Sequence, residues 1–130
     1  MKNSVSHFEI YADDTSKLVD FYTALFDWKV QAMPESHYTL ITTVDTNADG
    51  RPVQAGGING GIINVPGYKP GAWVNYVMVD SLDASVNKAV SLGARVTKPK
   101  SPVSGMGWFA MLIDPQGNAF AMFQQDSQAK

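Results

Sequence analysis

The stretch GMGWFAMLIDPQGNAFAMFQ, residues 105–124, decides the fold of this 130-residue chain. Two apolar runs flank residues 114–118, DPQGN, which contain Pro, Gly and Asn, three of the residues most typical of turns. Residues 108–113 and 119–124 are therefore predicted to be two strands joined by a tight turn. This hairpin is the end of a longer series of elements that begins near residue 5.

The first half of the chain has the pattern of a strand, a helix and three further strands. Residues 5–12 alternate between two kinds of side chain, which predicts a strand with His7, Glu9 and Tyr11 on one face. Asp13 and Asp14 can cap a helix, because apolar residues then recur at helical spacing up to about residue 26. Further strands are predicted over residues 28–33, 38–44 and 53–65.

The second half of the chain repeats this order. Residues 66–71, PGYKPG, form the predicted linker, because two Pro and two Gly cannot hold a helix or a central strand. A strand over 73–79 and a helix ending at Gly93 follow, and then a short strand over 95–97, which Pro99 and Pro102 end. The repeat predicts one domain made of two modules, about residues 4–65 and 72–126.

The composition narrows the class of protein. The chain is 45% hydrophobic, carries a net charge of -2 and contains no cysteine, which excludes disulfides, thiolate zinc sites and a cysteine nucleophile. No basic stripe suggests a nucleic acid, and no apolar run reaches the ~18 residues of a membrane span. Because the start of the sequence lacks the apolar core of a signal peptide, we expect a cytoplasmic protein. We also expect no nucleic-acid and no membrane partner.

Four motifs, in this order and at these spacings, carry a family resemblance: HFEIYADD (7–14), FYTALFDWKV (21–30), VDSLDASVNKAVSLGARV (79–96) and residues 105–124. Together they resemble the vicinal oxygen chelate superfamily, which includes glyoxalase I, bleomycin-resistance proteins and extradiol dioxygenases. The chain is most similar to the largely bacterial group described as related to lactoylglutathione lyase. The resemblance implies an α+β fold in which two tandem βαβββ modules form a curled mixed sheet around a cleft, with the helices outside.

The resemblance also implies a divalent metal centre, of which this chain keeps one ligand. His7 matches the family's histidine on the first strand, whereas Val74 and Ala121 stand where a second ligand and the family's glutamate are expected. Asn59 offers only a weak amide oxygen near the remaining position. We therefore expect no metal or other cofactor, and a rearranged site built from His7, Glu9 and His37 is the alternative.

His7 and Glu9 are the candidate catalytic residues, because an imidazole and a carboxylate on one strand face can do acid/base work with the Tyr11 phenol nearby. The alternative is that Glu9 only holds His7 in place. On the other strands, the residues that would face the same cleft are mostly apolar and aromatic, which predicts a largely apolar ligand site. The alternative is that these residues only pack in the core. Its candidate ligand-binding residues are Tyr11, Asn59, Val74, Tyr76, Met78, Trp108, Ala121 and Phe123.

The glycine-rich run GGINGG, residues 56–61, is not a phosphate-binding loop, since it lacks the spacing and the Lys-Ser/Thr pair of one. Glycines in a strand more often permit a bulge or the close approach of another backbone.

Three hypotheses for function follow. The first is a metal-free protein that binds a small, partly apolar molecule in its cleft, as the bleomycin-resistance relatives do. The second is a lyase or isomerase that uses a rebuilt metal site or His7 and Glu9. The third is a regulatory module that binds a protein partner. A homodimer is compatible with all three, because members of the superfamily that the chain resembles are often dimers and aromatic residues near strand edges would suit an interface.

Overall fold

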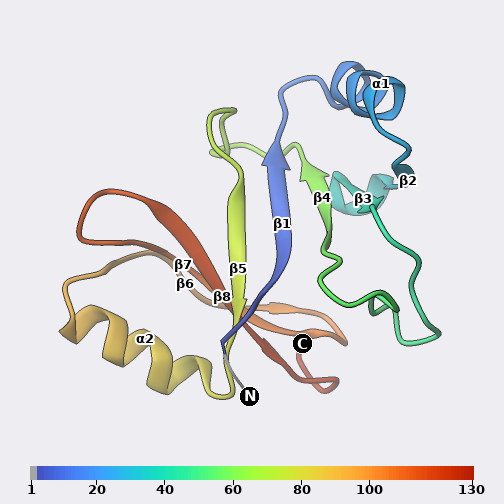
Figure 1. Cartoon of the computed structure of the whole chain (residues 1–130). Helices are drawn as coiled ribbons and strands as arrows, with labels where there is room; N and C mark the ends of the chain where they lie inside the picture. The colour runs from blue at the N-terminus through green and yellow to red at the C-terminus, as the bar shows by residue number, and fades with distance from the viewer. Residues whose placement is uncertain (1–2) are drawn as a thin grey trace. The chain divides into compact units, whose positions relative to one another are not determined.

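The computed structural model describes residues 3–130 and contains, within them, the predicted order of strand, helix and three strands, twice (Figure 1). Its elements are β1 (Val5–Tyr11), α1 (Thr15–Leu25), β2 (Lys29–Met33), a 3-10 turn (Pro34–Ser36), β3 (Tyr38–Thr42), β4 (Asn59–Ile63), β5 (Val74–Met78), α2 (Leu82–Ser91), β6 (Arg95–Val103), β7 (Gly107–Ile113) and β8 (Ala119–Gln125). The chain divides into two compact units, His7–Trp73 and the residues from Val74 onward together with those up to Ser6.

In the unit formed by His7–Trp73, the strands lie in the order β2-β3-β4-β1. β1 runs parallel to β4, and β2, β3 and β4 are successively antiparallel. Helix α1 covers one face of this sheet, because the alternate residues Phe8 and Ile10 turn the apolar side of β1 toward it. The core there consists of Phe8, Ile10, Ala12, Ile41 and Ile62, with Leu18, Val19, Tyr22, Trp28 and Ile58 packed against it.

Alternation therefore leaves His7, Glu9 and Tyr11 on the sheet face opposite to α1. The helix itself begins where the Asp14 side chain accepts a hydrogen bond from the Lys17 N–H, so Asp14 is the cap, one of the two candidates that the sequence offered. The face opposite to α1 is the one that carries the polar residues of interest.

In the second unit, the strands lie in the order β5-β8-β7-β6, and α2 packs against one face of them (Figure 1). Ser81 caps α2, and Gly93 takes a φ of +106° just after it, as expected for a glycine that ends a helix. The predicted hairpin is confirmed, since β7 and β8 pair antiparallel around residues 114–118. The core of the second unit consists of Val79, Leu82, Ala110, Leu112 and Met122.

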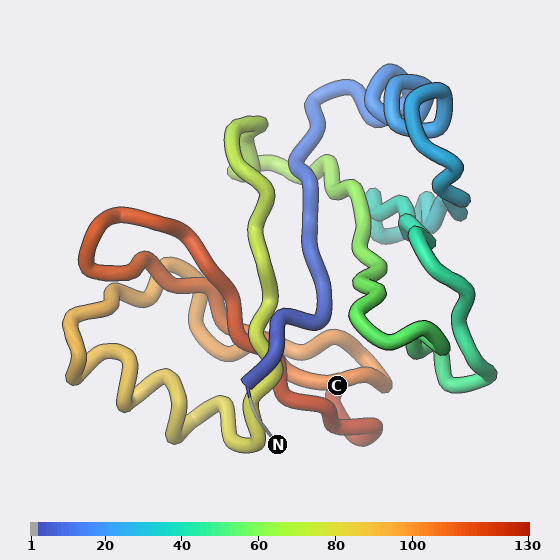
Figure 2. The backbone as a smooth tube through the Cα atoms, in the orientation of Figure 1, coloured from blue at the N-terminus to red at the C-terminus, as the bar shows by residue number. Residues whose placement is uncertain are grey.

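Two strand predictions were wrong. The strand predicted over residues 95–97 is longer in the structure, where β6 runs from Arg95 to Val103 through Pro99 and Pro102. It is an edge strand whose pairing with β7 shifts register twice, and edges and bulges are where proline is tolerated in a sheet. The strand predicted over residues 53–65 is shorter, because turns between Gln54 and Gly57 precede β4, as the backbone trace shows (Figure 2).

Candidate functional site

Tyr38, the first residue of β3, joins His7 and Glu9 of β1 into one hydrogen-bonded group. The Tyr38 hydroxyl lies 2.7 Å from His7 Nε2, and it also forms a hydrogen bond with the Glu9 side chain. His7 Nε2 lies 3.8 Å from Glu9 Oε2. A phenol has one proton to donate, and a carboxylate can only accept it, so we assign His7 Nε2–H as the donor to the Tyr38 oxygen.

Gly61 of β4 makes this group possible. β4 lies between β1 and β3, and Gly61 is paired with Glu9 on one side and with Leu40 on the other. A Cβ atom at Gly61 would overlap the ring and hydroxyl of Tyr38, so the phenol crosses β4 over a position that has no side chain. The sequence predicted a bulge or the close approach of another backbone at these glycines. At Gly60 an added Cβ atom would meet the backbone oxygen of Phe8, whereas at Gly61 it would meet a side chain.

The hydrogen-bonded group is partly withdrawn from water. Glu9 is only 8% exposed, whereas the His7 side chain remains 34% exposed. Burial raises the pKa of Tyr38 far above its usual value of 10.0, and the negative charge of Glu9 raises it further. Tyr38 therefore stays a neutral hydrogen-bond donor throughout the physiological pH range.

The negative charge of Glu9 also acts on two more phenols, those of Tyr11 and Tyr68. Burial, followed by the Glu9 charge, raises the pKa of both Tyr11 and Tyr68. The two rings stack with their centroids 5.0 Å apart and their planes at 16°. The Tyr11 hydroxyl is fully buried and has no hydrogen-bond partner among the described residues. Sequence reasoning did not identify Tyr38 or Tyr68, because both reach this group from separate segments of the chain.

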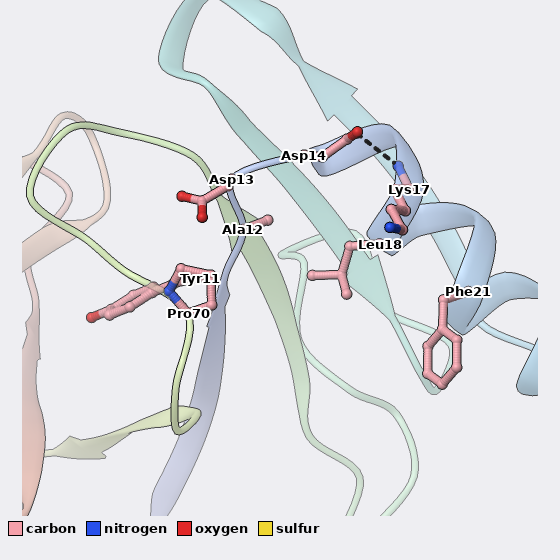
Figure 3. A pocket seen from close by; sticks show the side chains of 8 residues that line it. All are labelled: Tyr11, Ala12, Asp13, Asp14, Lys17, Leu18, Phe21 and Pro70. Carbon is pink, nitrogen blue, oxygen red and sulfur yellow. Dashed lines mark hydrogen bonds between the residues drawn. The ribbon is translucent and has the colours of Figure 1, made fainter.

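A hollow of about 430 Å³ lies beside Tyr11, at the start of α1 (Figure 3). The side chains around it are mostly apolar, and Lys17 and two aspartates are its charged members. Asp14 is occupied as the helix cap, as the dashed line in Figure 3 marks. The Tyr11 ring points away from Leu18 and Phe21, so its hydroxyl lies on the far side from the helix (Figure 3).

The residues at the family's ligand positions do not fit a family-type metal centre. His7 Nε2 is bonded to Tyr38, and Asn59 Oδ1 accepts the N–H groups of Thr43 at 2.7 Å and Val44 at 3.1 Å. Val74 and Ala121 are buried apolar side chains. His37 is an exposed residue at the end of the 3-10 turn. Within residues 3–130, no three side chains among His, Asp and Glu are grouped to hold a metal ion.

The remaining candidate residues lie in the second unit. Tyr76 pairs with Ala121, and Met78 with Phe123, so these four share the face of β5 and β8 opposite to α2. Val74 is buried on the same side of β5. Trp108 does not share this face, because it packs toward α2 and donates from Nε1 to Asp126 at 3.0 Å. On β7 it is Phe109 that lies on the same face as Tyr76, and the centroids of the two rings are 6.3 Å apart.

The duplicated order of strand, helix and three strands defines an α+β class of proteins in which a helix packs on each half of the strands. The glyoxalase-like domain family matches residues 7–123, and the chain belongs to this family. The fold that the sequence predicted is therefore confirmed at the level of the superfamily.

Two relatives of known name that are similar to this chain come from bacteria. It is 27% identical over 129 residues to the anthracycline biosynthesis protein DnrV of Streptomyces peucetius, covering 91% of this chain and 46% of that protein. It is 27% identical to the putative glyoxylase CFP32 of Mycobacterium bovis, covering 89% of this chain and 43% of that one. The chain thus spans less than half the length of these two relatives.

A methylmalonyl-CoA epimerase of Streptomyces coelicolor, solved with 2-nitronate-propionyl-CoA, has a similar fold. The TM-score is 0.63 at 16% identity, and the match covers 95% of this chain and 97% of that one. This likeness concerns the fold. Among residues 3–130, neither helix has the length and apolar character that crossing a membrane requires.

Proposed function

We propose that this chain binds a small, partly apolar molecule without a metal ion, on the sheet face that carries His7, Glu9 and Tyr38. The group formed by Tyr38, His7 and Glu9 carries this proposal. Withdrawing a carboxylate from water is costly, and a sheet surface with only a packing role needs no such group. The polar group lies beside apolar positions of the same face, such as Leu40 and Ile63, which is the usual make-up of a ligand site.

The comparisons support the proposal at the level of chemistry. The epimerase of similar fold was solved with a small-molecule ligand, and DnrV is described as a biosynthesis protein. Metal independence is supported by the two side chains that could ligate a metal, because His7 Nε2 and the Asn59 amide already form hydrogen bonds within the protein.

Metal analysis tests the metal-free part of the proposal. The chain is purified without a histidine tag, and its Zn, Ni, Mn and Fe contents are measured by mass spectrometry before and after dialysis against EDTA. We expect far less than one metal ion per chain and an unchanged melting temperature after dialysis. One tightly held divalent ion per chain, with a loss of stability on its removal, would contradict the proposal.

Binding is tested with the two histidines of the chain as a matched pair. His7 belongs to the proposed site, and His37 is an exposed residue at a turn. Small molecules that copurify with the wild type, His7→Ala and His37→Ala are released by denaturation and identified by mass spectrometry. We expect a stoichiometric compound with the wild type and His37→Ala, and its loss with His7→Ala. Retention by all three proteins would place binding elsewhere.

A second candidate function is acid/base catalysis by a lyase or isomerase of the same fold. The bond between His7 and Tyr38 favours it, because it orients an imidazole beside a buried carboxylate. Deuterium incorporation next to the carbonyl of a probe ketone, acetophenone, tests it by NMR in D₂O. Catalysis predicts exchange that is faster than in buffer and is lost in His7→Ala, whereas equal exchange in both proteins leaves binding as the function.

The proposal includes a cytoplasmic location, which rests on the absence of cysteine from the sequence. A homodimer is compatible with it, and light scattering of the purified chain measures the oligomeric state.

A further inference from the structure

We propose that a second copy of this chain packs against the outer side of α1 and pairs along the edge strand β2, so that the two sheets join β2 to β2 about a two-fold axis. The proposal does not depend on the proposed function. Two features of the unit formed by His7–Trp73 carry it: an apolar stripe on the outer side of α1 and an edge strand that is open to pairing.

Helix α1 carries apolar side chains on its inner and on its outer side. Leu18, Val19 and Tyr22 pack against the core of their unit. Phe21 and Leu25 lie one helical turn apart and are 56% and 58% exposed. A helix that packs against a single sheet needs one apolar side only, so a second apolar side is typical of a helix that has a further partner.

The second unit shows that the repeated fold does not require this outer stripe. Counted from their N-terminal caps, α1 and α2 can be compared position by position. Phe21 of α1 then corresponds to Lys88 of α2, and Phe26 at the end of α1 corresponds to Gly93. A charged residue and a glycine therefore stand in the second unit where the first exposes two aromatic rings.

The edge strands of the two units differ in the same sense. β6 contains Pro99 and Pro102, and its pairing with β7 shifts register twice, which are features that keep an edge from pairing with another chain. β2 contains no proline, pairs with β3 in one unbroken register, and exposes all five of its residues. Within residues 3–130, β3 is its only neighbouring strand, so the other edge of β2 is open.

The sequence of β2 is complementary to itself, which favours a second copy as the partner. In an antiparallel register centred on Gln31, Lys29 lies opposite Met33 and Val30 lies opposite Ala32. Lys29 is the only charged residue of the strand, so no like charges face each other. A two-fold axis through Gln31 generates this pairing, and such a contact closes as a dimer.

The apolar area next to β2 is sufficient for a dimer. Phe26 directly follows α1 and Val30 belongs to β2, so these two exposed residues connect the stripe of α1 with the edge strand. With Phe21 and Leu25 they expose on the order of 350 Å², taking 150–250 Å² for a whole aromatic side chain. A stable interface buries about 800 Å² on each partner. The four side chains supply nearly half of it, and the paired strands add to this.

Sedimentation velocity of the full chain between 1 and 200 µM tests the dimer. We expect a wild-type dimer that dissociates on dilution. Leu25→Glu should raise its dissociation constant at least about tenfold, because it places an unpaired charge in the interface. The matched control is Leu92→Glu, since Leu92 takes the same position in α2 and is 70% exposed; it should leave the constant unchanged.

Two results of this experiment would overturn the proposal. One is a wild type that stays monomeric at 200 µM, and the other is a dimer that Leu25→Glu does not weaken. Melting curves recorded at 1 µM check the folding of both variants, and we expect them to match the curve of the wild type because both leucines are exposed.

A disulfide between two copies tests the position of the two-fold axis. The chain contains no cysteine, so Gln31→Cys introduces a single thiol, which the proposed register places opposite the same thiol of the second copy. We expect mild oxidation to link most of this variant as a dimer. Thr97→Cys, at an exposed position of the edge strand β6, should stay largely unlinked. An unlinked Gln31→Cys, or equal linking rates of the two variants, would overturn the pairing of β2 with β2.

Discussion

At the scale of single residues, the candidate site depends on a side chain that is missing as much as on those present. Gly61 stands between Glu9 and Leu40 in the sheet, and the Tyr38 phenol crosses β4 at this point. His7, Glu9 and Tyr11 could be predicted from the alternation of β1. Tyr38 could not, because its contact with His7 spans 31 residues and depends on the register of three strands.

Replacing Gly61 with Ala should break the hydrogen-bonded group. The new methyl group occupies the place of the Tyr38 ring end, so the phenol has to leave His7 and Glu9. We expect a loss of about 1–3 kcal/mol in the free energy of unfolding, as for other overpacked sites. Urea denaturation measures it, and the shift of the His7 ring protons reports the lost contact. Gly71→Ala is the control, because nothing lies within 4 Å of its added Cβ.

Replacing Tyr38 with Phe tests the hydroxyl separately from the ring. The buried Glu9 carboxylate loses a donor, and His7 Nε2 loses its partner. The free energy of unfolding at pH 7 should fall by about 1–3 kcal/mol, the usual cost of leaving a buried polar group short of a bond. Thermal and urea denaturation measure it. An unchanged stability would show that the Tyr38 hydroxyl does not hold the group together.

At the scale of elements, local signals predicted the helices and the last hairpin, and long-range pairing decided the rest. Asp14 and Gly93 mark helix ends by their own chemistry, so the sequence was sufficient there. The strand β6 continues through Pro99 and Pro102 because it lies at an edge, and a sequence does not show which strand is at the edge. Likewise, the glycines before β4 suit a strand or a turn equally well.

The turn of the last hairpin should depend on the ionised Asp114 side chain. Its Oδ1 accepts the N–H groups of Gln116 and Asn118, both at 2.9 Å, and these bonds lower the pKa of Asp114. Because the folded-state pKa is below the unfolded value near 3.8, this stability is present above that value and is lost as the pH falls through the lower, folded-state pKa. Asp114→Ala should therefore destabilise the protein at pH 7.

The same difference should shrink steadily below pH 4, as the side chain becomes protonated in the wild type too. Urea midpoints of the wild type and of Asp114→Ala at pH 7 and at pH 3 check this. Asp20→Ala, which removes an exposed carboxylate from α1, is the control for the change in net charge. A pH-independent difference between the wild type and Asp114→Ala would contradict an electrostatic role for Asp114.

At the scale of the whole molecule, the internal repeat of the sequence was enough to predict that the order of strand, helix and three strands occurs twice. It was not enough to predict the site, because the two copies differ in the residues that matter. The first copy carries His7 and Glu9 on its first strand, and the second carries the apolar Val74 and the aromatic Tyr76 on β5. Duplication thus fixes the backbone pattern, while a function belongs to side chains that the repeat does not preserve.

The alkaline stability of the whole protein should reflect the three phenols near Glu9. The pKa values of Tyr11, Tyr38 and Tyr68 are raised above the ordinary 10.0, chiefly by burial. Below pH 10 these phenols keep their protons in both states, so their contribution to stability is complete. Above pH 10 the unfolded chain loses these protons first, so stability should fall as the pH rises toward the folded-state values.

Urea midpoints between pH 8 and pH 11.5 measure this fall, and absorbance at 295 nm follows the ionisation of the five tyrosines. We expect at least three of them to ionise only as the protein unfolds. Tyr38→Phe should lower the slope of stability against pH above pH 10 by about one proton, because it removes one late-titrating phenol. Titration of all five tyrosines near pH 10 in the folded protein would show that Glu9 and burial do not hold these phenols neutral.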